Sequence, residues 1–343
     1  MSSFTIGLAI LGGLVLAALV AWNTWTSRKN TPLQPESLPP ADPVMGEGGV
    51  DAGREEPSFD AAPALPALEK RPGLDALIDS IVPISLEGPV SGDAALAAMP
   101  PTRRAGSKPF AIEGLNDATQ EWETPRAGQR YGSFQAGVQL ANRLGALNEI
   151  EYSEFVVKAQ AFADAINGAP DFPEMLDEVA RGRELDQFAG EHDAQLGFTL
   201  RARNAAWSPG YVQQFASRLG FVAGAFPGRL VLPAVTPGSP PVLVLSFDTQ
   251  AALADDPAQT ALRELTLSLD VPQVDRSEQP FVRMRDAAIA LAASMDGLIT
   301  DDNGEVIRPE GLDVIGADLE HLYDTLDARD LSAGSPQARR LFS

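Results

Sequence analysis

A strand followed by a long helix in the second half of the chain decides the fold. Residues 265–271 read LTLSLDV, and residues 281–295 read FVRMRDAAIALAASM. The leucines of the first stretch alternate with polar residues, which predicts a strand with one buried face. The apolar residues from Phe281 to Met295 recur at spacings of 3, 4, 3 and 4, which predicts a helix with one apolar stripe. Such a helix is expected to cover one face of an antiparallel sheet, as in α+β folds.

The same order of elements is predicted twice along the chain. In the second half we expect further strands at 196–200, 222–233 and 241–247, and helices at 208–219 and 311–327. In the first half we expect strands at 82–86, 109–115 and 131–140, and helices from 91, at 152–167 and at 173–182. Both halves therefore predict a split β-α-β antiparallel sheet with helices on one face.

This repetition predicts the domain boundaries. We expect one α+β domain at 74–190, a second at 191–330, and a C-terminal tail at 331–343. We interpret the two domains as tandem related copies, one of them diverged. The alternative is that two unrelated α+β domains share their order of elements by chance.

An apolar segment precedes the folded part. Residues 4–22 read FTIGLAILGGLVLAALVAW and carry no charge. A helix of this length rises roughly 28 Å, close to the thickness of the hydrocarbon core. We therefore predict a single transmembrane helix with a basic flank within residues 1–29. The residues expected to form this membrane anchor are Phe4, Leu8, Leu11, Leu14, Leu19, Trp22, Trp25, Arg28 and Lys29.

The charge flanking this segment predicts its orientation. Arg28 and Lys29 follow the apolar run, whereas no basic residue precedes it, so the bulk of the chain is expected in the cytoplasm and the N-terminus in the periplasm. A cleaved signal peptide is the alternative, but a basic segment before the apolar run would be typical of one. Residues 30–73 are rich in proline and acids and lack apolar periodicity, which predicts a disordered linker.

The composition excludes or disfavours several classes of function. Asp and Glu outnumber Lys and Arg by 47 to 26, and the net charge of −21 disfavours nucleic acid as a partner. The chain has no cysteine and only two histidines. It contains no Gly-rich phosphate loop and no H-E-x-x-H or G-x-S-x-G motif. We therefore expect no catalytic residues, no enzyme activity, no cofactor and no metal.

The sequence contains three weaker candidates for a metal site. His192 and His321 each lie beside acidic residues, but neither has a second histidine nearby in the sequence. We therefore expect both side chains to face solvent and not to bind a metal. The stretch 301–310 partly resembles a calcium-binding loop, yet its first ligand position falls on Ile299. The Asn-Gly pair within it instead predicts a tight turn.

The layout and the second half of the chain resemble the ZipA family of bacterial cell-division proteins. The resemblance is carried by the anchor, by the sequence LGFTLRARNAAWSPGYVQQFASRLGFVAGAFPGRLVL at 196–232, and by QPFVRMRDAAIALAASMDGLITDDNGEVI at 279–307. Within these stretches, Gly220-Phe221 follows a helix as in the family, and Val271-Pro272 ends a strand.

The resemblance implies a binding site and a function. In the family, an exposed sheet face receives the C-terminal peptide of FtsZ, and the corresponding positions here are Gln195, Gly197, Phe226, Leu243, Leu245, Phe247, Thr266 and Ser268. For Phe226 and Phe247, burial in the core is the alternative. The implied function is a division adaptor that tethers FtsZ polymers to the cytoplasmic face of the inner membrane and stabilises the FtsZ ring.

The implied partners are FtsZ, other proteins of the division machinery and the lipid bilayer. Association of the chain with a second copy of itself is a further alternative. Two other functions are alternatives. One is a membrane-anchored structural protein with a different cytosolic partner, and the other is an envelope enzyme.

Overall fold

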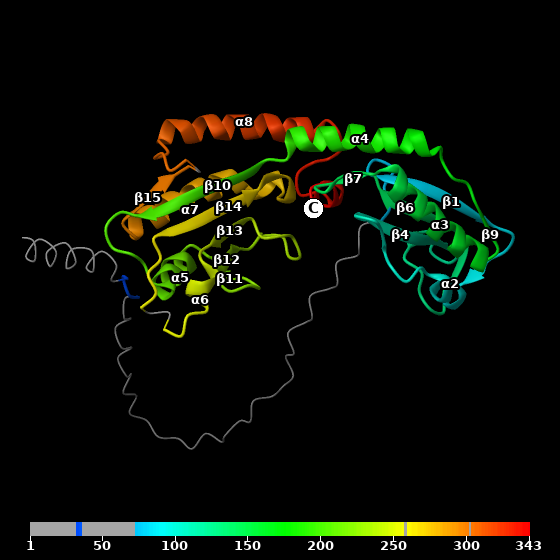
Figure 1. Ribbon diagram of the computed structural model, residues 1–343, viewed down its shortest axis with the longest axis horizontal. Coiled ribbons are helices and arrows are strands. Elements are labelled where there is room, and N and C mark those ends of the chain that lie inside the picture. Colours follow the sequence, from blue (N-terminus) through cyan, green and yellow to red (C-terminus); the bar gives the residue numbers. More distant parts are fainter. Residues whose placement is uncertain (1–31, 36–72, 257–258, 302) are drawn as a thin grey trace, which may run out of the picture. The chain divides into compact units, whose positions relative to one another are not determined.

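The computed structural model describes residues 32–35, 73–256, 259–301 and 303–343 (Figure 1). The predicted membrane anchor, from Phe4 to Lys29, lies outside these residues, as does most of the predicted linker. Among the described residues, no helix combines the length and the apolar character needed to cross a bilayer. The predicted α+β class is confirmed, because the chain forms antiparallel sheets together with helices.

The chain divides into two compact units whose boundaries differ from the predicted ones. The first unit comprises the described residues of 70–194, 271–276 and 318–343, and the second comprises those of 1–69, 195–270 and 277–317. The prediction of a C-terminal tail at 331–343 is wrong, as is the placement of 318–330 in the second domain. Apolar periodicity reports that a helix has a buried face, but not which sheet that face contacts.

The first unit is built on a sheet with the strand order β3-β4-β6-β1-β9. These strands are β1 (Asp79–Leu86), β3 (Arg104–Ala105), β4 (Lys108–Asn116), β6 (Arg130–Gln139) and β9 (Gly168–Pro170). The short strands of this unit are β2 (Val90–Ser91), β5 (Trp122–Glu123), β7 (Ala141–Asn142) and β8 (Gly145–Ala146). Its helices are α2 (Gly92–Ala98), α3 (Glu149–Ala165), α4 (Met175–His192), α9 (Pro336–Leu341) and the 3₁₀ turn η1 (Val271–Gln273).

The core of the first unit lies between this sheet and α3. Ile84, Phe134 and Gly114 lie opposite one another on three adjacent strands. Phe134 packs edge-on against Phe162 of α3, with 5.3 Å between ring centroids. A capping box starts α3. The side chain of Asn148 accepts hydrogen bonds from backbone N–H groups of the first turn, and the carboxylate of Glu151 accepts one from the N–H of Asn148.

The second unit is built on a sheet with the strand order β11-β12-β13-β14-β10-β15. These strands are β10 (Gln195–Ala202), β11 (Val222–Ala223), β12 (Arg229–Leu232), β13 (Leu243–Ser246), β14 (Glu264–Asp270) and β15 (Gly297–Thr300). Its helices are α5 (Pro209–Arg218), α6 (Thr249–Ala252), α7 (Pro280–Ser294), the turn η2 (Arg276–Glu278), which begins at the unit boundary, and the first residues of α8 (Pro309–Asp327).

The predicted strand at 265–271 and the predicted helix at 281–295 both form in the second unit. Leu265, Leu267 and Leu269 of β14 are buried, and so are Met284 and Leu291 of α7. Helix α7 contacts β14, β10 and β15, so it covers one face of the sheet. The side chains of a strand alternate between faces, and β14 therefore presents its polar residues on the face opposite to α7.

Both units share one connectivity. The first strand of each unit (β1 or β10) lies between the last long strand (β6 or β14) and a short strand that follows the main helix (β9 or β15). The second unit differs in having β11, which has no counterpart in the first unit, and in the length of β12 relative to β3. The same connectivity agrees with the predicted repetition of elements, and a common origin of the two units stays a prediction.

Candidate binding surface

One row of residues crosses five strands on the face of the second sheet that does not carry α7. The strand register places Gly197 opposite Ser268, Ser268 opposite Val244, Val244 opposite Val231, and Val231 opposite Val222. Directly opposed residues of antiparallel strands lie on the same face and in contact distance. The row therefore ends in three adjacent valines, and we call it the valine row.

The exposure of the residues confirms which face is open. Val222 is 51% exposed, and Val231 and Val244 are half-buried. In the adjacent register position, Phe198, Leu267 and Leu245 lie on the other face and are buried. No described part of the chain fully buries the valine row, so it is accessible to a partner.

Four of the predicted contact residues lie on this open face. Gly197 and Ser268 are members of the valine row, and Gln195 and Thr266 are exposed neighbours on the same face. Thr266 lies opposite Thr199 and Ser246, which makes the rim of the row polar. The register therefore places these four residues on the open face, and their role in binding stays a prediction.

The prediction that Leu243 and Leu245 line the same surface is wrong. Both leucines are 0% exposed, because they point to the helix-covered face. The residue of β13 that reaches the open face is Val244, which lies between them. Since the sequence VLVLS is apolar at both parities, alternation within this strand alone does not show which residues face outward.

The two predicted phenylalanines differ in their surroundings. Phe226 is 67% exposed in the turn between β11 and β12, so its alternative placement in the core is wrong. Phe247 is half-buried, and its N–H donates to the carbonyl oxygen of Gly228 at 2.9 Å. Gly228 has φ 75°, and an added Cβ would lie 2.7 Å from the carbonyl oxygen of Phe247, so only glycine fits this turn.

Sequence reasoning missed Val222, Val231 and Val244, which supply most of the apolar area of the row. The signal that could have found them is the pairing register: once Ser268 is placed on the open face, its neighbours across the sheet follow strand by strand. Charged residues border the row on the same sheet, since Arg229 is exposed and Arg201 pairs with Glu264 at 3.2 Å.

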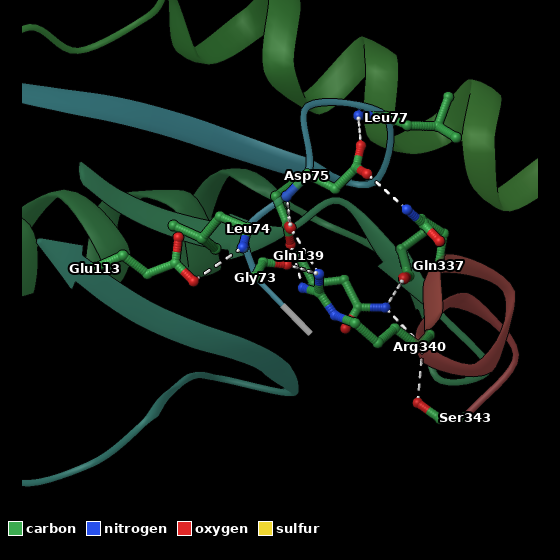
Figure 2. Close-up of polar contacts among 11 residues, drawn as sticks. Gly73, Leu74, Asp75, Leu77, Glu113, Gln139, Gln337, Arg340 and Ser343 are labelled. Atoms are coloured by element: carbon green, nitrogen blue, oxygen red, sulfur yellow. Dashed lines mark hydrogen bonds and ion pairs between the residues drawn. The ribbon is translucent and has the colours of Figure 1, made fainter. Parts of the chain in front are cut away.

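The equivalent face of the first unit is partly covered by the chain itself. There the register places Ile81, Gly137 and Ala111 in one row. A Cβ added to Gly137 would lie 2.5 Å from Cδ2 of Leu74, so the leucine side chain rests directly on this glycine. The N–H of Leu74 donates to Oε1 of Glu113 at 3.2 Å, which holds the covering segment in place (Figure 2).

A polar cluster lies at the end of this covered face (Figure 2). Arg340 of α9 donates to both carboxylate oxygens of Asp79, at 2.5 and 2.9 Å, although Asp79 is almost fully buried. Gln139 donates to the carbonyl oxygen of Arg340, and Gln337 donates to Asp75. Burial raises the pKa of the Asp79 carboxyl, and the bond and charge of Arg340 oppose this rise.

A second buried cluster joins the turn before β4 to α3. The Lys108 amine is buried and donates to Oδ1 of Asn142 at 2.9 Å and to Oγ of Ser107 at 3.0 Å. The Ser107 hydroxyl donates to Oε1 of Glu151 at 2.6 Å. Burial lowers the pKa of the Lys108 ammonium. These groups satisfy one another, which is typical of a structural contact between a strand and a helix.

The weaker metal candidates have other structural roles. Nδ1 of His192 lies 2.7 Å from the carbonyl oxygen of Phe188, on whose ring the imidazole stacks. His321 is exposed on α8. The predicted tight turn is confirmed, because Oδ1 of Asp301 accepts from the N–H groups of Asn303 and Glu305. No group of residues suited to a metal ion occurs in the described ranges.

No protein-family model matches the chain, and no curated protein sequence is significantly similar to it.

Proposed function

We propose that the chain is a membrane-anchored, non-catalytic adaptor that binds the C-terminal peptide of FtsZ through the open face of its second unit. In this role it would tether FtsZ polymers to the cytoplasmic face of the inner membrane. The observation that supports the proposal best is the valine row on a sheet whose opposite face is occupied by α7.

The chemistry of the surface suits a peptide better than a small molecule. The valine row crosses the strands, and it is bordered by hydroxyl side chains such as those of Thr266 and Ser246. A short apolar peptide can bury its larger side chains against Val231 and Val244 while its polar groups stay at the rim. Phe226 is the exposed aromatic residue of the hairpin beside the row, and aromatic residues are common binding hot spots.

Anchoring would compensate for a modest contact area. An adaptor held at the membrane meets a polymer that presents many identical tails, so several weak contacts act together. The proposed anchor is the apolar segment 4–22, with Arg28 and Lys29 on the cytoplasmic side. A periplasmic reporter enzyme fused after Ser343 is expected to be inactive, and activity of that fusion would contradict the proposed topology.

The binding proposal is tested with the full chain in liposomes and assembled FtsZ. Val244→Asp places a charge in the middle of the valine row, where desolvating a carboxylate opposes the docking of an apolar peptide. We expect this variant to lose co-sedimentation with FtsZ polymers. Ala111→Asp on the equivalent face of the first unit is the matched control, because Ala111 is exposed.

Two outcomes would contradict this proposal. One is the absence of any association of the unchanged chain at tens of micromolar, either with polymers or with the isolated tail peptide. The other is an equal loss of association in the Val244→Asp and Ala111→Asp variants, because the open face of the second unit would then not be the site.

A further inference from the structure

Residues 32–35 lie against the second unit and are held there by backbone hydrogen bonds. The N–H of Leu33 donates to the carbonyl oxygen of Ala206 at 2.7 Å, and the N–H of Ser208 donates to the carbonyl oxygen of Leu33 at 3.1 Å. Leu33 thereby forms a parallel bridge with Trp207. This corrects the prediction that 30–73 is one continuous free linker, since its first described residues pack on a folded unit.

The partner of this segment is a rigid part of the second unit. Trp207 is fully buried and also forms an antiparallel bridge with Leu262, with both hydrogen bonds at 2.8 Å. Its indole Nε1 donates to the carbonyl oxygen of Met295 at 2.7 Å. The backbone that receives Leu33 is therefore fixed on its other side and by its own side chain.

Side-chain packing adds to the backbone contacts. Pro32 is buried, although it lies at the start of the described segment. A Cβ added to Gly210 of α5 would lie 3.1 Å from Cγ of Pro35, so the proline ring rests closely on this glycine. Both prolines have a restricted φ, so less conformational entropy is lost when the segment docks. The segment is consequently held at both ends, by Pro32 and by Pro35, as well as by the bridge at Leu33.

We propose that residues 32–35 are a clamp that holds the second unit directly at the bilayer surface. The inference rests on the proposed membrane anchor, which ends at Arg28 and Lys29. Three peptide steps join Lys29 to Pro32, and they span at most about 11 Å. A free tether over residues 30–73 would instead separate the membrane and a folded unit by roughly 35 Å r.m.s..

The clamp changes which parts of the protein the linker connects. Residues 36–72 join the clamped second unit to the first unit, rather than joining the membrane to both units. The valine row is then presented close to the lipid, and its distance from the bilayer does not depend on the length of residues 36–72.

A pair of insertions tests this consequence. Gln213→Cys gives an exposed label site on α5 in a chain that has no cysteine of its own. Energy transfer is measured from a dye at this cysteine to acceptor lipids in liposomes that carry the full chain. A Gly-Ser insertion of about 20 residues between Asn30 and Thr31 adds roughly 25 Å r.m.s. to the membrane connection and is expected to lower the transfer by about half.

The matched control is the same insertion between Met45 and Gly46, which is expected to leave the transfer unchanged. If both insertions lower the transfer equally, residues 30–73 act as one flexible linker that does not dock on the second unit, and the clamp is disproved. If neither insertion lowers it, the clamp is disproved as well, because the distance to the lipid is then not set by this connection.

A cross-link tests the docking without the membrane. Pro35→Cys together with Gly210→Cys is expected to form a disulfide rapidly under mild oxidation, since a Cβ at position 210 would lie 3.1 Å from Cγ of Pro35. Pro43→Cys together with Gly210→Cys is the control and is expected to react more slowly. Equal rates would overturn the docking of residues 32–35.

The two readouts separate failure of the clamp from failure of the proposed anchor. A fast cross-link in a chain that shows no transfer to lipid would disprove the anchor, and with it the placement at the membrane. Transfer to lipid without a preferred cross-link would disprove the clamp and leave the anchor standing.

Discussion

The two units have the same strand connectivity but differ in what lies on the face opposite to their main helix. In the second unit this face carries the valine row, whose members are half-buried or exposed. In the first unit the corresponding row is partly covered by Leu74, and the cluster around Arg340 closes its end (Figure 2). A sheet of this kind is therefore available to a partner only where its own chain leaves one face uncovered.

The largest expected effect is a loss of stability that is confined to the second unit. Trp207→Ala removes a fully buried indole from the second unit and should lower its free energy of unfolding by about 3–5 kcal/mol. Hydrogen exchange resolved by residue should show the loss in the second unit. Trp122→Ala in the first unit is the control, because Trp122 is 41% exposed and should cost much less. Equal loss of protection in both units would contradict the division.

The next effect tests what closes the face of the first unit. Arg340→Ala leaves the carboxylate of Asp79 buried without its cation, which should lower the free energy of unfolding of the first unit by about 3 kcal/mol. The measurement is denaturant unfolding monitored by hydrogen exchange. Arg130→Ala, at an exposed position of β6, serves as the control. If both variants lose the same stability, the Asp79–Arg340 pair does not hold α9 in place.

A smaller effect concerns binding to the second unit. Phe226→Asp should weaken binding of the FtsZ tail peptide by about 1–3 kcal/mol, as expected for an exposed aromatic hot spot. Titration calorimetry measures the affinity, and circular dichroism should be unchanged because Phe226 is exposed. Val235→Asp is the control, since Val235 is 82% exposed in the same unit. Equal weakening by both variants would indicate a general effect of charge.

The smallest effect is a pH dependence confined to the first unit. Burial, together with Glu178 and Glu174, raises the pKa of Tyr152 to about 12. A raised pKa in the folded state means that the stabilisation is fully present below the ordinary pKa of tyrosine and is lost as the pH rises through about 12. The Tyr152 hydroxyl also donates to the carbonyl oxygen of Pro173 at 2.6 Å.

Tyr152→Phe should therefore cost about 1 kcal/mol at neutral pH, which is the typical contribution of one hydrogen bond. The variant should also show a smaller alkaline loss of stability in the first unit, where burial raises the pKa values of Tyr131 and Tyr323 as well. The free energy of unfolding measured at intervals between pH 9 and pH 12 gives both quantities. An unchanged alkaline slope in the variant would show that Tyr152 is not the titrating group.

Local patterns predicted the secondary structure well, because each strand and helix buries one face. The alternation at Leu265, Leu267 and Leu269 and the spacing in α7 correctly predicted a helix-covered antiparallel sheet. Alternation could not assign β13, where both faces are apolar, so it gave no check on the resemblance, which implied Leu243 and Leu245 in place of Val244. Assigning such a strand requires the register to a neighbour whose faces differ in polarity.

Contacts between distant parts of the sequence could not be predicted. Asp79 and Arg340 form an ion pair although no local sequence pattern links them. Leu74 packs on Gly137 because this glycine leaves room for the leucine side chain, and no periodic pattern marks such a contact. The docking of Leu33 depends on backbone groups, which every residue type carries. The resemblance to the ZipA family, and the function it implies, stay predictions.

The contact between α9 and the start of the first unit has a consequence for biosynthesis. Asp79 leaves the ribosome long before Arg340, so the first unit cannot complete its polar cluster until residue 340 has been translated. The second unit comprises no described residue beyond 317, so all its described residues are translated before Arg340. A nonsense mutation shortly before codon 340 would thus damage a unit whose strands are translated much earlier.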